Sequence, residues 1–156
     1  MTAQRVESLQ LMMQREQQHC DQAQSALQRA DESARRAREQ CRQLVAYRGE
    51  YEARWSAQFN QGGTMDILIC YRSFMQRLDQ AVAVQTRQVE LAERQVAQAR
   101  RELLECERRV ASVRKLLERR RAELAQAGRQ REQKHSDEQA QRMRWQPSQR
   151  DRLLPQ

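Results

Sequence analysis

Apolar side chains recur along most of this chain at alternating spacings of three and four residues, and this repeat restricts the fold more than any other feature. In the first run of fourteen such positions, only Glu16 and Arg48 are charged. The run consists of Leu9, Met13, Glu16, Cys20, Ala23, Leu27, Ala30, Ala34, Ala37, Cys41, Leu44, Arg48, Tyr51 and Trp55. A repeat averaging 3.5 residues keeps one seam of a helix apolar, as in a left-handed coiled coil. We therefore expect a helix over about residues 5–57.

A second run of eighteen positions follows, and only Gln85 and Arg120 in it are polar. It consists of Leu68, Tyr71, Met75, Leu78, Val82, Gln85, Val89, Ala92, Val96, Ala99, Leu103, Cys106, Val110, Val113, Leu117, Arg120, Leu124 and Ala127. This run predicts a second helix over about residues 65–144.

The two runs are separated by a turn signal, because Gly62 and Gly63 lie between Asn60 and Thr64. Two amphipathic helices joined by a short turn, here residues 58–64, pack antiparallel. The predicted fold is all-α, a long antiparallel two-helix coiled-coil hairpin that forms a single domain over residues 1–145. Pro147 ends the predicted second helix, so we expect a disordered tail over residues 146–156.

A two-helix coiled coil offers no enclosed site for catalysis, which needs converging groups in a concave pocket. The only histidines, His19 and His135, have no ligand partners at useful helical spacing, and the four cysteines lack metal-ligand spacing. No phosphate-binding loop is present in the sequence. We therefore expect no enzyme, no cofactor, no metal and no small-molecule substrate. The absence of a signal-peptide core or an apolar run of membrane-spanning length predicts a cytoplasmic protein with reduced thiols.

Arginine supplies most of the net charge of +8, and basic residues are dense between Arg108 and Arg131. Three interpretations are open: a solvated helix face, a basic end that inserts into an acidic protein partner, or a nucleic-acid surface. No aromatic residues are interleaved for stacking on bases, so nucleic acid is the least favoured partner.

A second apolar seam lies one residue before each position of the second run, close to the turn. Six of its first eight positions are apolar: Ile67, Cys70, Phe74, Arg77, Ala81, Val84, Gln88 and Leu91. One helix–helix seam cannot cover both edges, because they lie about 100° apart around the helix. The second seam is therefore either local packing against Trp55, Phe59 and the turn, or an exposed docking surface.

Several short motifs, in this order and spacing, resemble the FliJ family of flagellar type III export over about residues 5–145. They are Leu44, Tyr47, Glu50 and Tyr51, then Gly62–Gly63, then Tyr71-x-x-Phe74-x-x-x-Leu78-x-x-Ala81, and finally Lys134-x-x-Asp137-Glu138-x-Ala140-x-Arg142.

The resemblance implies a protein similar to the rotor stalk of F-type ATPases, peripherally associated with the inner membrane at the flagellar base. Such a protein inserts the end bearing both termini into the hexameric export ATPase and promotes its assembly. It contacts the cytoplasmic domain of the export gate through Phe74, Leu78 and Ala81, and it handles export chaperones. Within the basic end, the candidate ATPase-ring contacts are Arg114, Lys115, Arg119, Arg120 and Arg121. The alternatives are the equivalent stalk of a virulence secretion system and a basic coiled coil that binds nucleic acid.

Overall fold

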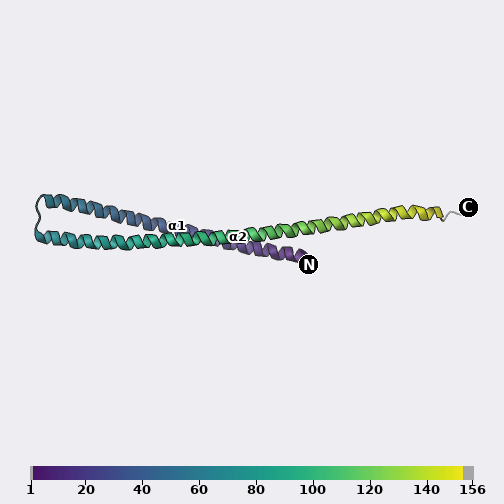
Figure 1. Ribbon diagram of the computed structural model, residues 1–156, viewed down its shortest axis with the longest axis horizontal. Helices are drawn as coiled ribbons and strands as arrows, with labels where there is room; N and C mark the ends of the chain where they lie inside the picture. Colours follow the sequence, from purple (N-terminus) through teal and green to yellow (C-terminus); the bar gives the residue numbers. More distant parts are fainter. Residues whose placement is uncertain (1, 153–156) are drawn as a thin grey trace. The chain divides into compact units, whose positions relative to one another are not determined.

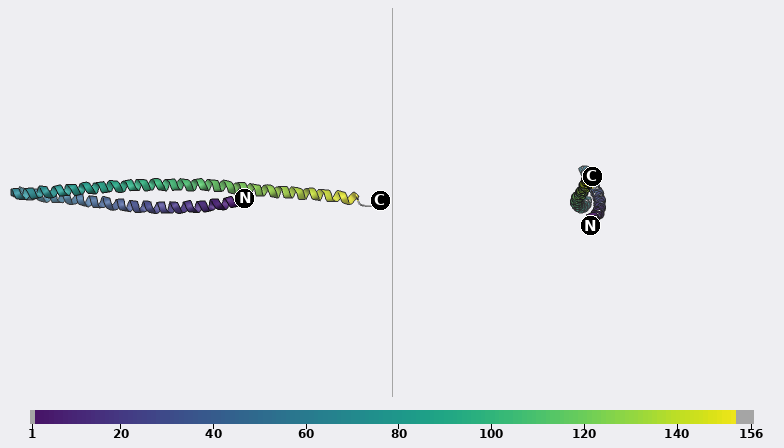
Figure 2. Two further views of the ribbon diagram at one scale, coloured as in Figure 1. Left: turned by 90° about the horizontal axis from the view of Figure 1, so that it is seen from below. Right: turned by 90° about the vertical axis from the view of Figure 1, so that its right-hand side faces the viewer.

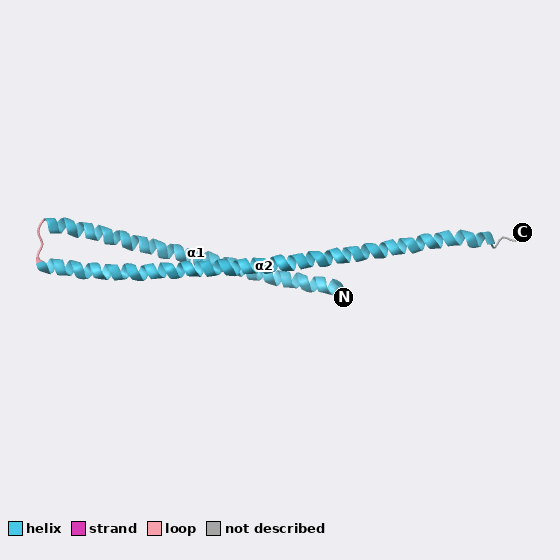
Figure 3. Ribbon diagram, in the orientation of Figure 1, coloured by secondary structure: helices cyan, strands magenta, loops and turns pink. Residues whose placement is uncertain are grey.

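The computed structural model describes the backbone of residues 2–152 and the side chains of residues 3–145. It contains two helices, α1 (Thr2–Asn60) and α2 (Met65–Arg152), and no strand among the described residues (Figures 1 and 3). The predicted all-α hairpin of two long helices packed against each other is confirmed.

The chain divides by its internal packing into two units. The turn unit comprises Gln18–Glu107, and the terminal unit comprises Met1–Gln17 together with Arg108–Gln156. Within each unit a segment of α1 lies beside an antiparallel segment of α2, as Figure 1 and the left-hand view of Figure 2 show together.

The connection between the helices depends on two glycines that differ in what they provide. Gly62 has a φ of 105°, a backbone conformation that side chains other than glycine's rarely adopt, and its N–H donates to the Phe59 carbonyl (3.2 Å). Gly63 leaves room for the Phe59 ring, because a Cβ there would lie 2.9 Å from Phe59 Cδ1. Thr64 then caps α2, since its hydroxyl oxygen accepts from the Ile67 N–H (3.5 Å).

The core of the turn unit is narrow and built from small residues. Ala34 of α1 packs with Ala92 and Val96 of α2, which are 1%, 6% and 8% exposed. Leu27, Ala30 and Ala37 pack against this cluster. Most of the side chains that meet here are alanines, so this part of the core has little volume.

The two apolar runs describe the buried seam almost completely. Every one of their positions is buried or half-buried except Ala127, which is exposed. Few other described residues join them: Val6, Ala26, Phe59, Ile67 and Phe74. The prediction of the seam is therefore confirmed.

Polar residues on the seam of the turn unit find partners across the helix pair. The Gln85 amide donates to the Ala37 carbonyl (3.2 Å) and lies 3.4 Å from Gln40 Oε1. The Arg48 guanidinium donates to Asp79, and this bond holds the pKa of Arg48 above its ordinary value. These bonds fix which residues face each other, a role that a buried polar group plays well in coiled coils.

Two cysteines also meet across this seam. Cys20 of α1 and Cys106 of α2 are both half-buried. Burial raises the pKa of the Cys20 thiol, and the hydrogen bond and charge interaction with Cys106 raise it further. Both thiols are free, and they are the cysteine pair that the seam brings together.

In the terminal unit, Val110 and Leu117 are the buried residues of α2 among those with described side chains. From residue 125 to residue 145 every side chain of α2 is exposed. The predicted helix end near residue 144 and the predicted disorder from residue 146 do not match α2, which continues through Pro147 to Arg152. Proline lacks a backbone donor and its ring crowds the carbonyl of the preceding turn, which is why the sequence predicts a break there; α2 nevertheless continues through Pro147. Residues 153–156, the rest of the predicted tail, lie outside the described residues.

Candidate protein-docking surfaces

An aromatic cluster close to the turn sets the positions of the side chains on the second seam. Tyr51 of α1 lies between Tyr47 and Phe74, with ring centroids 6.1 Å and 4.3 Å away respectively. Trp55 contacts Tyr71 at 5.4 Å. Because the Phe74 ring rests on Tyr51, Phe74 is half-buried and held in place while part of it still faces solvent.

Further along α2, the second seam is exposed. Ala81 is exposed, and Val84 and Leu91 are 53% and 56% exposed. On α1, Tyr47 is 48% exposed and connects to Phe74 through Tyr51. We call Tyr47, Phe74, Ala81, Val84 and Leu91 the lateral edge. The second seam thus combines both interpretations, because Phe74 packs on Tyr51 whereas Ala81, Val84 and Leu91 remain exposed.

The three residues expected to contact the export gate have different environments. Phe74 is half-buried, Leu78 is only 8% exposed, and Ala81 is exposed. The Leu78 side chain belongs to the core between the helices, as its place in the 3–4 repeat requires. Leu78 therefore does not present a contact surface beside Phe74 and Ala81.

The basic residues expected to contact the ATPase ring lie on α2 in the terminal unit. Arg114, Lys115, Arg119 and Arg121 are exposed. Arg120 is half-buried on the seam and forms an ion pair with Glu123 at 3.1 Å.

A shallow groove lies beside this basic surface in the terminal unit. It runs between the start of α1 and α2, and its lining consists of Gln4, Arg5, Ser8, Leu9, Leu116 and Arg120. Its apolar floor and basic margins suit an acidic protein segment better than a neutral one. The repeat does not predict this groove, although Leu116, an apolar residue one position off the repeat, is a signal for it.

Among residues with described side chains, no group of three or more His, Cys, Asp or Glu could hold a metal ion. In the described part of the chain, neither helix contains an apolar stretch long enough to span a bilayer.

The model of the flagellar FliJ protein family matches residues 4–149, which is nearly the whole chain. The chain belongs to the FliJ family. The resemblance inferred from the sequence motifs is therefore confirmed, and it identifies a component of flagellar type III protein export. No curated protein and no solved structure matches the chain.

Membership of the FliJ family agrees with a helical hairpin whose surfaces are suited to binding proteins. The lateral edge and the basic surface of the terminal unit are the two candidate docking surfaces. They differ in chemistry, because the first is apolar and aromatic and the second is cationic.

Proposed function

We propose that this FliJ-family chain is a coiled-coil stalk of the export apparatus, without enzymatic activity of its own. It inserts into the hexameric export ATPase, promotes assembly of the ring, and couples the ring to the export gate. It also handles export chaperones, and it works in the cytoplasm, peripherally associated with the inner membrane at the flagellar base.

The observation that carries this proposal is the cationic surface of the terminal unit. Arg114, Lys115, Arg119 and Arg121 are exposed on the stretch of α2 in which Val110 and Leu117 are buried. Arginine binds carboxylates through a planar fork of donors, so such a surface suits an acidic lining. Charges at the margin of an interface mainly raise the association rate, which favours insertion of the stalk into a ring.

The lateral edge is the proposed contact for the cytoplasmic domain of the gate. Phe74 and Ala81 supply contact surface on α2, and Val84 and Leu91 extend it. Leu78 contributes from the core, because it holds this part of α2 against α1. An aromatic side chain at the centre of such a patch commonly contributes much of the binding energy.

The test is stimulation of the purified export ATPase by the full-length chain. Reversal of three basic residues, Arg119→Glu, Arg120→Glu and Arg121→Glu, should greatly weaken ring binding and stimulation. A matched reversal on exposed arginines of the turn unit, Arg94→Glu, Arg100→Glu and Arg101→Glu, changes the net charge by the same amount. We expect this control to retain stimulation.

Equal losses in both variants would mean that only net charge matters. Full stimulation by the first variant would remove the support for insertion through the basic surface. ATP turnover by the purified chain alone would contradict the proposed non-enzymatic role.

A further inference from the structure

The end of the hairpin at the turn is almost free of charge. Between Arg54 on α1 and Arg72 on α2, Asp66 is the only Asp, Glu, Lys, Arg or His in the sequence. In a chain with 32% charged residues, seventeen consecutive positions would ordinarily hold several charges. We call residues 55–71 the turn tip. Depletion of charge on an exposed segment is a mark of surface that becomes buried against a partner.

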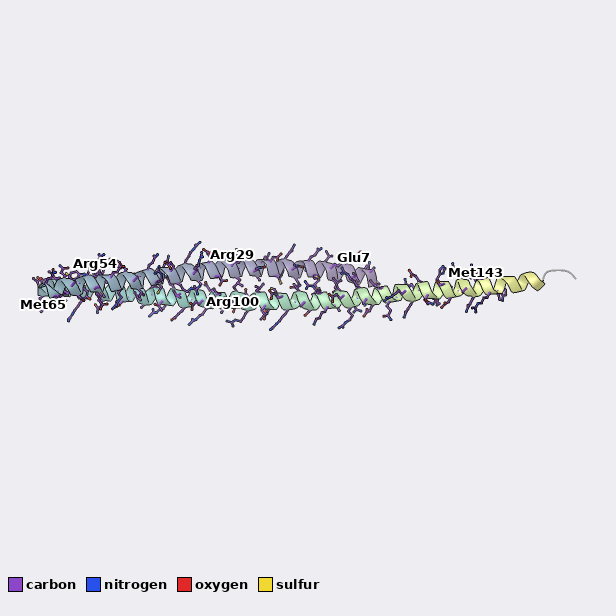
Figure 4. The ribbon with its side chains drawn as sticks, turned by 90° about the horizontal axis from the view of Figure 1, so that it is seen from above. Glu7, Arg29, Arg54, Met65, Arg100 and Met143 are labelled. Atoms are coloured by element: carbon purple, nitrogen blue, oxygen red, sulfur yellow. The ribbon has the colours of Figure 1, made fainter. Side chains whose placement is uncertain are left out.

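Within the turn tip, large apolar side chains face solvent. Met65 is 70% exposed and Ile69, one helical turn later on the same face, is 60% exposed. Figure 4 labels Met65 at the turn, with Arg54 on the neighbouring stretch of α1. The other faces of this part of α2 carry half-buried Ile67 and Leu68. The first two turns of α2 are therefore apolar on nearly all sides, a pattern that helices show when they are buried all round.

The exposed face of the turn tip is distinct from the lateral edge. At about 100° per residue, Met65 and Ile69 lie roughly opposite Phe74 around the axis of α2. Arg72 lies on the same face as Met65 and Ile69, one turn further along. A partner that covers Met65 and Ile69 therefore does not need to contact the gate-binding residues.

The order of residue types away from the turn matches the layers of a membrane interface. On α2, aliphatic Met65 and Ile69 come first, Tyr71 follows, and Arg72 comes next. On α1, read from the turn, Phe59 and Trp55 precede Arg54. Aliphatic residues favour the acyl region and arginines the anionic headgroups, while the rings of Trp55, Phe59 and Tyr71 are half-buried against one another between the helices.

The length of the apolar part of the turn tip also agrees with the depth of a membrane interface. Seven residues of helix separate Met65 from Arg72, a rise of about 10 Å, and interfacial segments enter the membrane to a depth of about 5–10 Å. We propose that the turn tip binds an anionic lipid surface, with Met65 and Ile69 entering the boundary of the acyl region and Arg54 and Arg72 contacting lipid phosphates. Asp66, which is exposed in the first turn of α2, limits this insertion to a shallow depth.

The experiment measures partition of the full-length protein onto vesicles near physiological salt. One set of vesicles contains phosphatidylglycerol and phosphatidylethanolamine, and the other contains phosphatidylcholine alone. Trp145→Phe leaves Trp55 as the only tryptophan, so a blue shift of its fluorescence reports entry of the turn tip into an apolar environment. We expect binding and a blue shift with the anionic vesicles.

The decisive variant is Met65→Ser with Ile69→Ser, and its matched control is Val84→Ser with Leu91→Ser. The control removes two apolar side chains of similar exposure from the lateral edge. We expect the first variant to lower the partition coefficient about tenfold or more and the control to stay within about twofold. Arg54→Gln with Arg72→Gln should weaken binding to the anionic vesicles, by about fivefold per residue, and leave binding to neutral vesicles unchanged.

Three results would overturn the proposal. One is the absence of vesicle binding. Another is binding that survives Met65→Ser with Ile69→Ser but is lost when the basic residues of the terminal unit are reversed, which would assign it to charge attraction there. The third is a loss of binding to the gate's cytoplasmic domain in the tip variant with no change on vesicles, which would assign the tip to a protein partner. The vesicles contain neither ATPase nor gate, so the stalk function stands or fails separately.

Discussion

Replacing Leu78 with alanine should damage the hairpin itself rather than a docking contact. Leu78 is 8% exposed, and it lies close in sequence to Met75, which is equally buried. Truncation of a buried leucine usually costs about 2–5 kcal/mol. The core here is only one seam wide, so the space left by the truncated side chain opens toward solvent. The free energy of unfolding should therefore decrease by an amount near the lower end of this range, about 2–3 kcal/mol. For a chain of this size each kcal/mol lowers the Tm by about 2–4 °C, so we expect a decrease of about 5–10 °C.

The contrasting variant is Ala81→Arg, in the same region of α2. Ala81 is exposed and arginine is a good helix former, so the stability should change by no more than about 0.5 kcal/mol. A long charged side chain on the lateral edge should nevertheless obstruct a partner there. We expect binding to the gate's cytoplasmic domain to fall about tenfold or more.

The assay pairs thermal unfolding, followed by circular dichroism, with gate-binding titrations at a temperature where both variants are folded. We expect Leu78→Ala to melt early and bind normally, and Ala81→Arg to melt normally and bind poorly. A wild-type Tm for Leu78→Ala would refute the burial argument. Normal binding by Ala81→Arg would remove the lateral edge as the gate contact.

Three further outcomes follow from individual contacts. Glu16→Leu should raise the Tm, because a buried Glu16 oxygen has no hydrogen-bond partner among the described residues and leucine restores the apolar repeat. We expect the free energy of unfolding to increase by about 1 kcal/mol or more. An unchanged or lower Tm would contradict this reasoning. Mild oxidation by diamide should join Cys20 to Cys106 in a disulfide, which peptide mass mapping would detect. In an alkylation experiment, Cys70 should react before Cys20, because Cys70 is exposed and the raised pKa of Cys20 leaves less thiolate on Cys20 at a given pH. Faster alkylation of Cys20 would argue against its pairing with Cys106. Phe74→Ala should lose about 1–2 kcal/mol, less than Leu78→Ala, because its ring is only half-buried on Tyr51; equal destabilisation in chemical denaturation would make Phe74 a core residue.

The sequence alone determined the helices and the seam between them. In a two-helix coiled coil a side chain is buried when it recurs every three and four residues, so burial follows from the period without knowledge of distant contacts. This explains why even polar Gln85 and Arg48 lie on the seam, and why Ala127 is exposed: it lies beyond the stretch of α2 that the start of α1 covers. The family also followed from the sequence, because its motifs are local and their order is preserved.

Only the tertiary structure decided how the side chains beside that seam are used. Their exposure depends on which residue of the other helix lies opposite, and the repeat does not state this. The tilted ring contact between Phe74 and Tyr51, the exposure of Val84 and Leu91, and the exposure of Met65 at the turn all arise in this way. Leu78 shows that a sequence motif does not state the exposure of its members. The motif groups Leu78 with Phe74 and Ala81, but Leu78 is buried, Phe74 is half-buried and Ala81 is exposed. The physical reason is that a periodic pattern fixes which face of a helix is buried. How far the buried surface extends around the helix at each position along it depends on the shapes of the side chains from both helices that pack there.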